Sequence, residues 1–414
     1  MNAIADILIM LNVLGMNTMD RREFIKTCAA GAAIATALPL MAQDAKPQPP
    51  DYKQFLPLRS RATIPDWAKK EIATTLARYK AWKGDDMTVA FPLVTDVHCR
   101  PHTLPTDLSS FTVPKMHLLF AQLAGEEANA DFIADLGDID LDFAFEVAEN
   151  GAKKIRPYKP EEFMSRVAVQ QALYAESKLP VLCAVGNHDH ALNRFTSAQF
   201  GKAFNVTINQ GKDFKITLCP TADYGYYDMP EKKTRAIFLN TSDDGYYGYS
   251  IAQLEFIVNA LASMQENWTA VIMQHFCIQH EIGHWATSIP HVRAKRQDIV
   301  IRIMEDFVAH RKGELEGVQW NFTNGGNRWL AGCLAGDSHI DNYLKCNGVD
   351  YIISQGYGPM APHNVIPGAH LTAFDSSKQM LIDFVAIKPA KHEVKIFRLG
   401  AGGAERDRGY KYLS

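Results

Sequence analysis

The sequence predicts an α/β protein, and its hydrophobic pattern is the first reason. Beyond residue 67, short apolar runs of strand length alternate with longer segments of helical periodicity. Strands separated by helices in this order are typical of an α/β domain with a buried sheet. The second reason is size, because 414 residues with 47% hydrophobic content can bury one large core or two smaller ones.

The N-terminal segment lies outside this pattern. Arg21 and Arg22 precede a short, Ala-rich apolar stretch that ends in small residues near Ala42. This order resembles a twin-arginine export signal, and the stretch is too short and too weakly apolar to span a membrane. We therefore expect residues 1–45 to be a signal peptide with the start of a linker. The mature protein is expected to be periplasmic or otherwise exported, with no membrane span.

The rest of the chain divides into a linker region and a main domain. Residues 46–87 are expected to be a linker with an amphipathic helix at 67–82, and residues 88–414 the main domain. The predicted strands of this domain are 89–95, 132–136, 181–185, 236–240, 270–274, 330–335, 351–354, 381–387 and 394–398. Its predicted helices are 113–128, 160–178, 251–265 and 292–311. The strands after residue 311 have no helices between them, so we expect mixed pairing or a second sheet.

Composition excludes several classes of function. The net charge is −3 at pH 7 and no long run of one sign occurs, which gives no reason to expect a nucleic-acid partner. The chain has seven cysteines but no CxxC pair, so a zinc ribbon or a thioredoxin-like site is unsupported. It also contains no P-loop and no dinucleotide-binding fingerprint.

Polar side chains that can bind metals follow five of the apolar runs directly. They are Asp96, His98, Asp138, Asn187, His275, Asp337 and His339. In open α/β sheets, ligands bind outside the carboxyl ends of the strands. Five strands therefore deliver these side chains to one edge of the predicted sheet. Any one of them alone is more often a turn, a cap or a structural histidine, so their convergence carries the prediction.

These segments resemble the motifs of a known family. They read Asp-Val-His at 96–98, Gly-Asp at 137–138, Gly-Asn-His-Asp at 186–189, a lone His275, and Gly-Asp-Ser-His at 336–339. In this order they resemble the calcineurin-like metallophosphoesterase family, which includes the purple acid phosphatases. The resemblance covers about residues 88–340, and the segment 395–412 also looks like the tail of bacterial members. It implies a four-layer α/β/β/α sandwich with two central mixed sheets.

The resemblance also implies two metal ions and a phosphoester substrate. Asp138 would bridge the ions; the first would also bind Asp96, His98 and His339, and the second Asn187 and His275. Mixed imidazole and carboxylate ligands suit Fe, Mn or Zn. Two such ions would support in-line attack of a metal-bridging hydroxide on a small-molecule phosphate monoester or diester. The substrate itself and the oligomeric state stay open.

Three further residues receive roles in substrate binding or catalysis. His188 would donate a proton to the leaving group or stabilise the phosphoryl charge, and Asp189 would orient the His188 imidazole. Arg100, with Asn187 and His188, is expected to contact the substrate.

The sequence departs from the family pattern at two positions. Asp337 replaces the first histidine of the family's Gly-His-x-His segment, and it would either bind the second ion through oxygen or weaken that site. Leu141 stands where purple acid phosphatases carry a tyrosinate, so no purple colour is expected.

Two alternative functions compete with the phosphoesterase. The segment 280–284, His-Glu-Ile-Gly-His, matches the HExxH signature of zinc proteases, but Gly283 disfavours the helix that this signature requires. The other alternative is a non-catalytic or single-metal binding module on the same scaffold, which only Asp337 suggests.

Overall fold

The computed structural model describes residues 51–55, 64–98, 113–139, 143–147, 153–157, 159–189, 195–245, 247–279, 294–356 and 380–412. All of them belong to one compact unit of the chain. The predicted signal peptide, residues 1–45, lies outside the described residues. None of the helices in the described ranges combines the length and the apolar character needed to cross a membrane.

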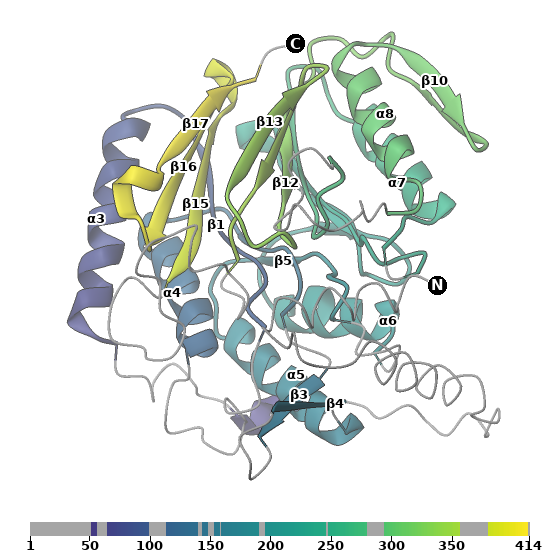
Figure 1. Cartoon of the computed structure of the whole chain (residues 1–414). Helices are drawn as coiled ribbons and strands as arrows, with labels where there is room; N and C mark the ends of the chain where they lie inside the picture. Colours follow the sequence, from purple (N-terminus) through teal and green to yellow (C-terminus); the bar gives the residue numbers. More distant parts are fainter. Residues whose placement is uncertain are drawn as a thin grey trace, which may run out of the picture. The chain divides into compact units, whose positions relative to one another are not determined.

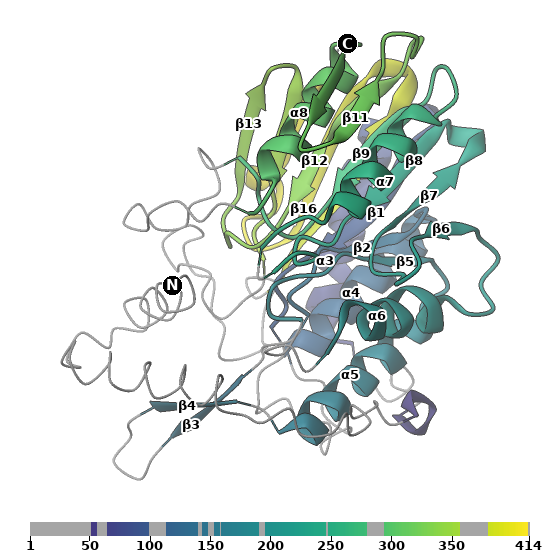
Figure 2. The same ribbon diagram turned by 90° about the vertical axis from the view of Figure 1, so that its right-hand side faces the viewer.

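Two mixed sheets form the centre of this unit (Figures 1 and 2). The first has six strands in the order β17 (Arg408–Lys411), β16 (Glu393–Gly400), β15 (Leu381–Lys388), β1 (Val89–Val94), β2 (Ile133–Asp135) and β5 (Val181–Cys183). The second has seven strands in the order β13 (Asn342–Cys346), β14 (Val349–Ile353), β12 (Trp329–Ala335), β9 (Thr269–Met273), β8 (Thr234–Phe238), β7 (Gly225–Met229) and β6 (Ile216–Leu218). Two separate hairpins pair β3 (Phe143–Val147) with β4 (Lys153–Pro157), and β10 (Lys312–Leu315) with β11 (Val318–Asn321).

Each sheet has a parallel core extended by antiparallel strands. In the first sheet β1, β2 and β5 run parallel, and in the second β8, β9, β12 and β14 do. The carboxyl ends of parallel neighbours lie at the same edge of a sheet. A parallel bridge between Val185 and Asn240, just beyond β5 and β8, joins the two sheets at that edge.

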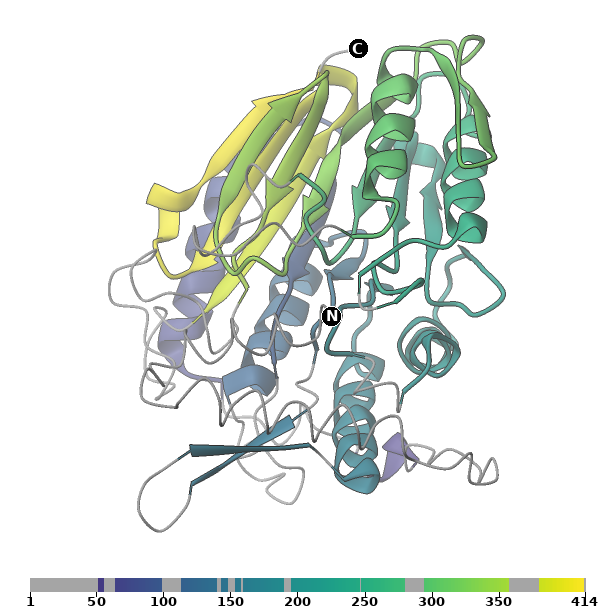
Figure 3. The same ribbon diagram turned by 45° about the vertical axis from the view of Figure 1, so that its right-hand side comes forward.

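The helices cover the outer faces of the sheets (Figure 3). The first sheet packs against α3 (Asp66–Lys83), α4 (Val113–Ala128) and α5 (Pro160–Ala175), and the second against α7 (Ile251–Ala262) and α8 (Gln297–Val308). A third apolar cluster lies between the sheets. The four-layer α/β/β/α arrangement that the family resemblance implied is therefore confirmed.

Strand β1 shows why its sequence is apolar without alternation. Phe91 and Leu93 face the core between the sheets, whereas Ala90 and Val94 face the helices. Successive side chains of a strand point to opposite faces, so a strand buried on both faces needs apolar residues at every position.

The remaining elements differ from the prediction in their ends and at the sheet edges. Helix α5 ends at Ala175 and α8 spans Gln297–Val308, both shorter than expected, and β10 begins at Lys312. Strands β6, β7, β13 and β17 were not predicted. Strand β13, for example, has only half-buried and exposed residues, so it carries no apolar run to signal it.

Candidate metal centre

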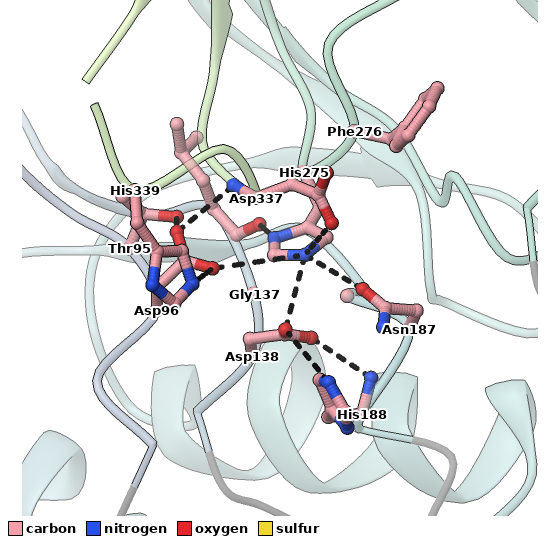
Figure 4. Close-up of polar contacts among 12 residues, drawn as sticks. Thr95, Asp96, Gly137, Asp138, Asn187, His188, His275, Phe276, Asp337 and His339 are labelled. Atoms are coloured by element: carbon pink, nitrogen blue, oxygen red, sulfur yellow. Dashed lines mark hydrogen bonds and ion pairs between the residues drawn. The ribbon is translucent and has the colours of Figure 1, made fainter. Parts of the chain in front are cut away.

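The centre lies where three parallel strands of the first sheet and two of the second end, so that residues from both sheets contribute to it. Figure 4 shows these side chains pointing toward one another. Strands β1, β2 and β5 of the first sheet end at Val94, Asp135 and Cys183, and β9 and β12 of the second end at Met273 and Ala335. The predicted metal-binding residues follow these ends: Asp96, His98, Asp138, Asn187, His275, Asp337 and His339. The structure brings the side chains of all seven into one cluster.

Unusual backbone conformations place these side chains. Asp96, His98, Asp138, Asp337 and His339 all have positive φ, between 44° and 62°. A non-glycine residue in this region costs about 1–3 kcal/mol, and such residues cluster at functional sites.

Backbone hydrogen bonds hold the conformations in place. The N–H groups of Asp96 and His98 donate to the carbonyls of Gly137 and Asp138, both at 3.0 Å. The N–H of Asp337 donates to Asp96 Oδ2, also at 3.0 Å, and so ties the two sheets together.

Gly186 gives the Asp138 loop its close approach. A Cβ at Gly186 would lie less than 3.0 Å from the backbone N, the Oδ1 and the Cγ of Asp138. Only glycine leaves this space free, which explains the glycine before Asn187.

One ligand group consists of Asp96, His98 and His339, all buried. His339 Nε2 lies 3.0 Å from Asp96 Oδ1, and the Nε2 atoms of His98 and His339 are 3.4 Å apart. Thr95 donates its hydroxyl proton to Asp96 Oδ2 at 2.7 Å and fixes the carboxylate. Three side-chain donor atoms thus converge on one point, as a metal site requires.

A second, overlapping group consists of Asp96, Asp138 and His275. His275 Nε2 lies 3.3 Å from Asp138 Oδ2 and 3.0 Å from Asn187 Oδ1. Asp138 Oδ2 is also 3.6 Å from His98 Nε2 of the first group. Asp96 is common to both groups, and Asp138 Oδ2 lies within 3.6 Å of a histidine of each group.

Burial and neighbouring charges set the protonation of these ligands. Burial opposes ionisation of Asp96, but His339 and His275 outweigh it and lower its pKa to about 2. Burial also opposes ionisation of Asp138, yet His275 and His188 bring its pKa below the usual range. For His98 burial prevails over the attraction of Asp138 and lowers the pKa to about 3. Two buried carboxylates are therefore ionised beside a neutral imidazole.

The pKa values of His275 and His339 are raised, in contrast to that of His98. Burial would lower the pKa of each imidazole, but Asp138 raises that of His275 well above the ordinary value and Asp96 raises that of His339. The geometry agrees for His275, because its Nδ1 lies 2.9 Å from the Leu136 carbonyl and its Nε2 faces oxygen acceptors. The neighbouring carboxylates thus favour a positive charge at each of these rings.

The donor set fits a pair of first-row metal ions. It combines buried carboxylate oxygens, imidazole nitrogens and an amide oxygen, which suit Zn, Fe or Mn. The hydrogen bond between His275 Nδ1 and the Leu136 carbonyl fixes the tautomer that presents Nε2, as in most metal-binding histidines.

His188 lies beside the ligands and reaches solvent. Its Nε2 is 4.0 Å from Asp138 Oδ2, and its side chain is 19% exposed, against 3% for Asp138. Its backbone N–H donates to Asp138 Oδ1 at 2.9 Å, which fixes its position. The imidazole therefore stands between the buried carboxylates and the solvent.

Asp189 makes contacts that the sequence analysis did not predict. Its carboxylate accepts backbone N–H bonds from Asp138 and Ile139, both at 2.9 Å, and from Gly186 at 2.8 Å. These bonds join the loop after β2 to the loop after β5. Asp189 thus holds two loops together, and its expected role in orienting the His188 imidazole stays a prediction.

Asp337 has a partner that the sequence analysis did not assign. Its Oδ1 lies 3.5 Å from His275 Nε2 and accepts a hydrogen bond from the Tyr247 hydroxyl at 3.2 Å. Asp337 thus faces the second ligand group, although it belongs to neither tight cluster of donor atoms. Only the aromatic run around residue 247 could have suggested this contact.

Several predicted features lie outside the described residues. They are Arg100, Leu141 and the HExxH segment 280–284.

Similar folds occur among solved structures. A dimetal phosphatase from Danio rerio matches with a TM-score of 0.50 and 13% identity, over 78% of this chain and 99% of that chain. GAP50, the anchor in the inner membrane complex of Plasmodium, matches with a TM-score of 0.45 and 9% identity, over 79% of this chain and 90% of that chain. A putative 5'-nucleotidase from Staphylococcus aureus matches with a TM-score of 0.35 and 12% identity, over 79% of this chain and 55% of that chain. The likeness to the Danio rerio phosphatase shows a common fold. The sequence matches no protein-family model and no curated protein.

Proposed function

We propose that this protein is an exported phosphoesterase of the calcineurin-like type that uses two metal ions. The observation that carries the proposal is the pair of ligand groups that share Asp96, with Asp138 of the second group 3.6 Å from His98 of the first. Both groups lie at the carboxyl ends of parallel strands, where α/β folds bind ligands. The Danio rerio protein that shares the fold is a dimetal phosphatase, which agrees with this function.

Six side chains would hold the two ions. Asp96, His98 and His339 would bind the first, Asn187 and His275 the second, and Asp138 both. When bound, such ions acidify a water molecule and draw charge from the phosphoryl oxygens of the substrate. Asp337 would add an oxygen to the second ion.

The chain's own contribution to the reaction is placed on His188. Its imidazole is the solvent-facing group beside the buried ligands, so it can meet a phosphoester that enters from solvent. A protonated His188 would donate its proton to the leaving alkoxide or balance the charge on the phosphoryl group. The hydrogen bond from its backbone to Asp138 ties the position of the proton donor to that of the bridging ligand.

The proposal is tested by measuring metal content and turnover in the same purified protein. About two ions per chain, with Mn-, Fe- or Zn-dependent hydrolysis of an aryl phosphate monoester or diester, are expected. His188→Ala should keep both ions and lose about 10²–10⁴-fold in turnover. A His188→Ala protein with full turnover would contradict the role given to this residue.

The same measurement decides the alternative of a single-metal or non-catalytic binding module. The observation that favours it is that Asp337 belongs to neither of the two tight groups of donor atoms, although it lies 3.5 Å from His275 Nε2. One ion per chain without turnover under any of the three metals would establish that alternative.

Export is the remaining part of the proposal. It rests on Arg21 and Arg22 ahead of the apolar segment. Replacing both by lysine should leave the protein in the cytoplasmic fraction of a bacterial host. Unchanged export of this variant would refute the twin-arginine route.

A further inference from the structure

Tyr247 lies outside the predicted set of site residues and contacts the centre directly. Its hydroxyl donates to Asp337 Oδ1 at 3.2 Å. Its ring packs against Phe276, the residue after His275, with the ring centroids 4.4 Å apart. Tyr247 therefore contacts the segments after β9 and β12, which carry His275 and Asp337 (Figure 4 shows Phe276, His275 and Asp337).

Asp337 needs such a contact more than the other carboxylates of the centre do. Its side chain is 15% exposed, against 0% for Asp96 and 3% for Asp138. Asp96 and Asp138 are held in addition by Thr95 and by the His188 backbone. A partly exposed aspartate has two equivalent oxygens and free rotation about its last bond, so an external donor must select one orientation.

The Tyr247 hydroxyl selects the orientation in which Asp337 faces His275. The Oδ1 atom that accepts its proton is also the atom 3.5 Å from His275 Nε2. A carboxylate oxygen has two lone pairs, so Oδ1 can accept this hydrogen bond and still offer a lone pair to a cation. Hydrogen-bond donors of this kind orient metal-binding carboxylates.

We propose that Tyr247 is a positioning residue that holds Asp337 as an oxygen ligand of the second metal ion. The inference rests on the proposed function and deepens it. It explains how the centre accommodates aspartate where the family pattern has histidine, because the tyrosine hydroxyl orients the carboxylate.

The test is the affinity of the metal-free full chain for Mn²⁺, measured by isothermal titration calorimetry. Tyr247→Phe removes only the hydroxyl and keeps the ring on Phe276. It should weaken one of the two Mn²⁺ sites about tenfold and leave the other unchanged. The matched control is Tyr343→Phe on β13, which also removes a tyrosine hydroxyl that donates to an aspartate, Asp350, at 2.7 Å. Its Mn²⁺ affinities should equal those of the unaltered chain.

A second pair of variants shows whether Tyr247 acts through Asp337. The double variant Asp337→Ala with Tyr247→Phe should bind Mn²⁺ with the same affinity as Asp337→Ala alone. A further loss in the double variant would mean that Tyr247 acts through its loop, and unchanged affinity of Tyr247→Phe would mean that it does not act; either result overturns the proposal. Fewer than two ions in the unaltered chain would refute the proposed function itself, and that failure is visible before any variant is made.

Discussion

Binding of metal ions to the metal-free chain is expected to release about two protons from imidazole rings, one each from His275 and His339. Both ring nitrogens of His275 face acceptors, since Nδ1 lies 2.9 Å from the Leu136 carbonyl and Nε2 lies 3.0 Å from Asn187 Oδ1. His339 Nε2 lies 3.0 Å from Asp96 Oδ1 and gains a proton in the same way. A metal ion takes the Nε2 lone pair of each ring and must displace these protons.

The other ligands add nothing to this number. Burial lowers the pKa of His98 to about 3, so this imidazole is neutral before a metal arrives. The pKa of Asp96 is lowered to about 2 because His339 and His275 outweigh the effect of burial. Near neutral pH these groups have no proton to lose. The logarithm of the metal affinity should therefore rise by about one to two per pH unit below the pKa of the two protonated rings.

The protonation of these two rings also determines how the stability of the metal-free chain changes with pH. An imidazole whose pKa is raised in the folded state stabilises that state fully below its unfolded value, about 6.5, and loses this contribution as pH rises through the folded pKa. The metal-free chain should thus lose thermal stability as pH rises through that range. The metal-loaded chain should gain it, because metal binding strengthens with pH.

Two measurements check the protonation. Nitrogen-15 NMR of the metal-free chain should show His275 and His339 as imidazolium at pH 7 and His98 as neutral imidazole. Calorimetric titration with Zn²⁺, in buffers of different ionisation enthalpy, should show net proton release. Neutral rings at His275 and His339 in the metal-free chain would refute the reasoning, whatever the calorimetry gives.

Three substitutions test the supports of the centre. Asp189→Ala removes the acceptor of three buried N–H groups and should lower the free energy of unfolding in urea by about 1–3 kcal/mol for each. The control Asp66→Ala, at a side chain that is 98% exposed, should change it little. Equal stability of the two variants would contradict the role of Asp189 in joining the loops. Arg398→Met should lower the free energy of unfolding by about 3–5 kcal/mol, because Arg398 is fully buried and pairs with Asp341 at 2.6 Å and with Asp383 at 3.0 Å. An unchanged midpoint of urea unfolding would contradict this expected loss of stability. Gly186→Ala should displace Asp138 and abolish metal binding while the circular dichroism spectrum stays native. Retention of both ions would show that the loop can shift to make room for the added Cβ.

Much of the centre could be predicted because its residues follow buried strands directly. Asp96, Asp138 and His275 each come within three residues of the end of an apolar run. Parallel strands end at the same edge of a sheet, so their order along the chain already places these side chains together. The apolar runs themselves were visible because strands buried on both faces need hydrophobic residues at every position.

The supports of the centre could not be predicted in the same way. Tyr247 and Asp337 are 90 residues apart in the chain, and Arg398 and Asp341 are 57 apart. No local pattern links such pairs, since each residue alone is compatible with an exposed loop or a strand end. The contacts of Asp189 were not predicted for the same reason, because the backbone N–H groups that it binds belong largely to another loop.

The sequence by itself determined the α/β class, the buried strands and the residues that gather at their ends. The reason is that the hydrophobic pattern of neighbouring residues reveals each strand and the residues that follow it. The tertiary structure alone decided which oxygen of Asp337 faces His275, which loops Asp189 joins and how the C-terminal strands fix the segment after His339. Those outcomes depend on distances between segments that are far apart in the sequence, and such distances exist only once the chain has folded.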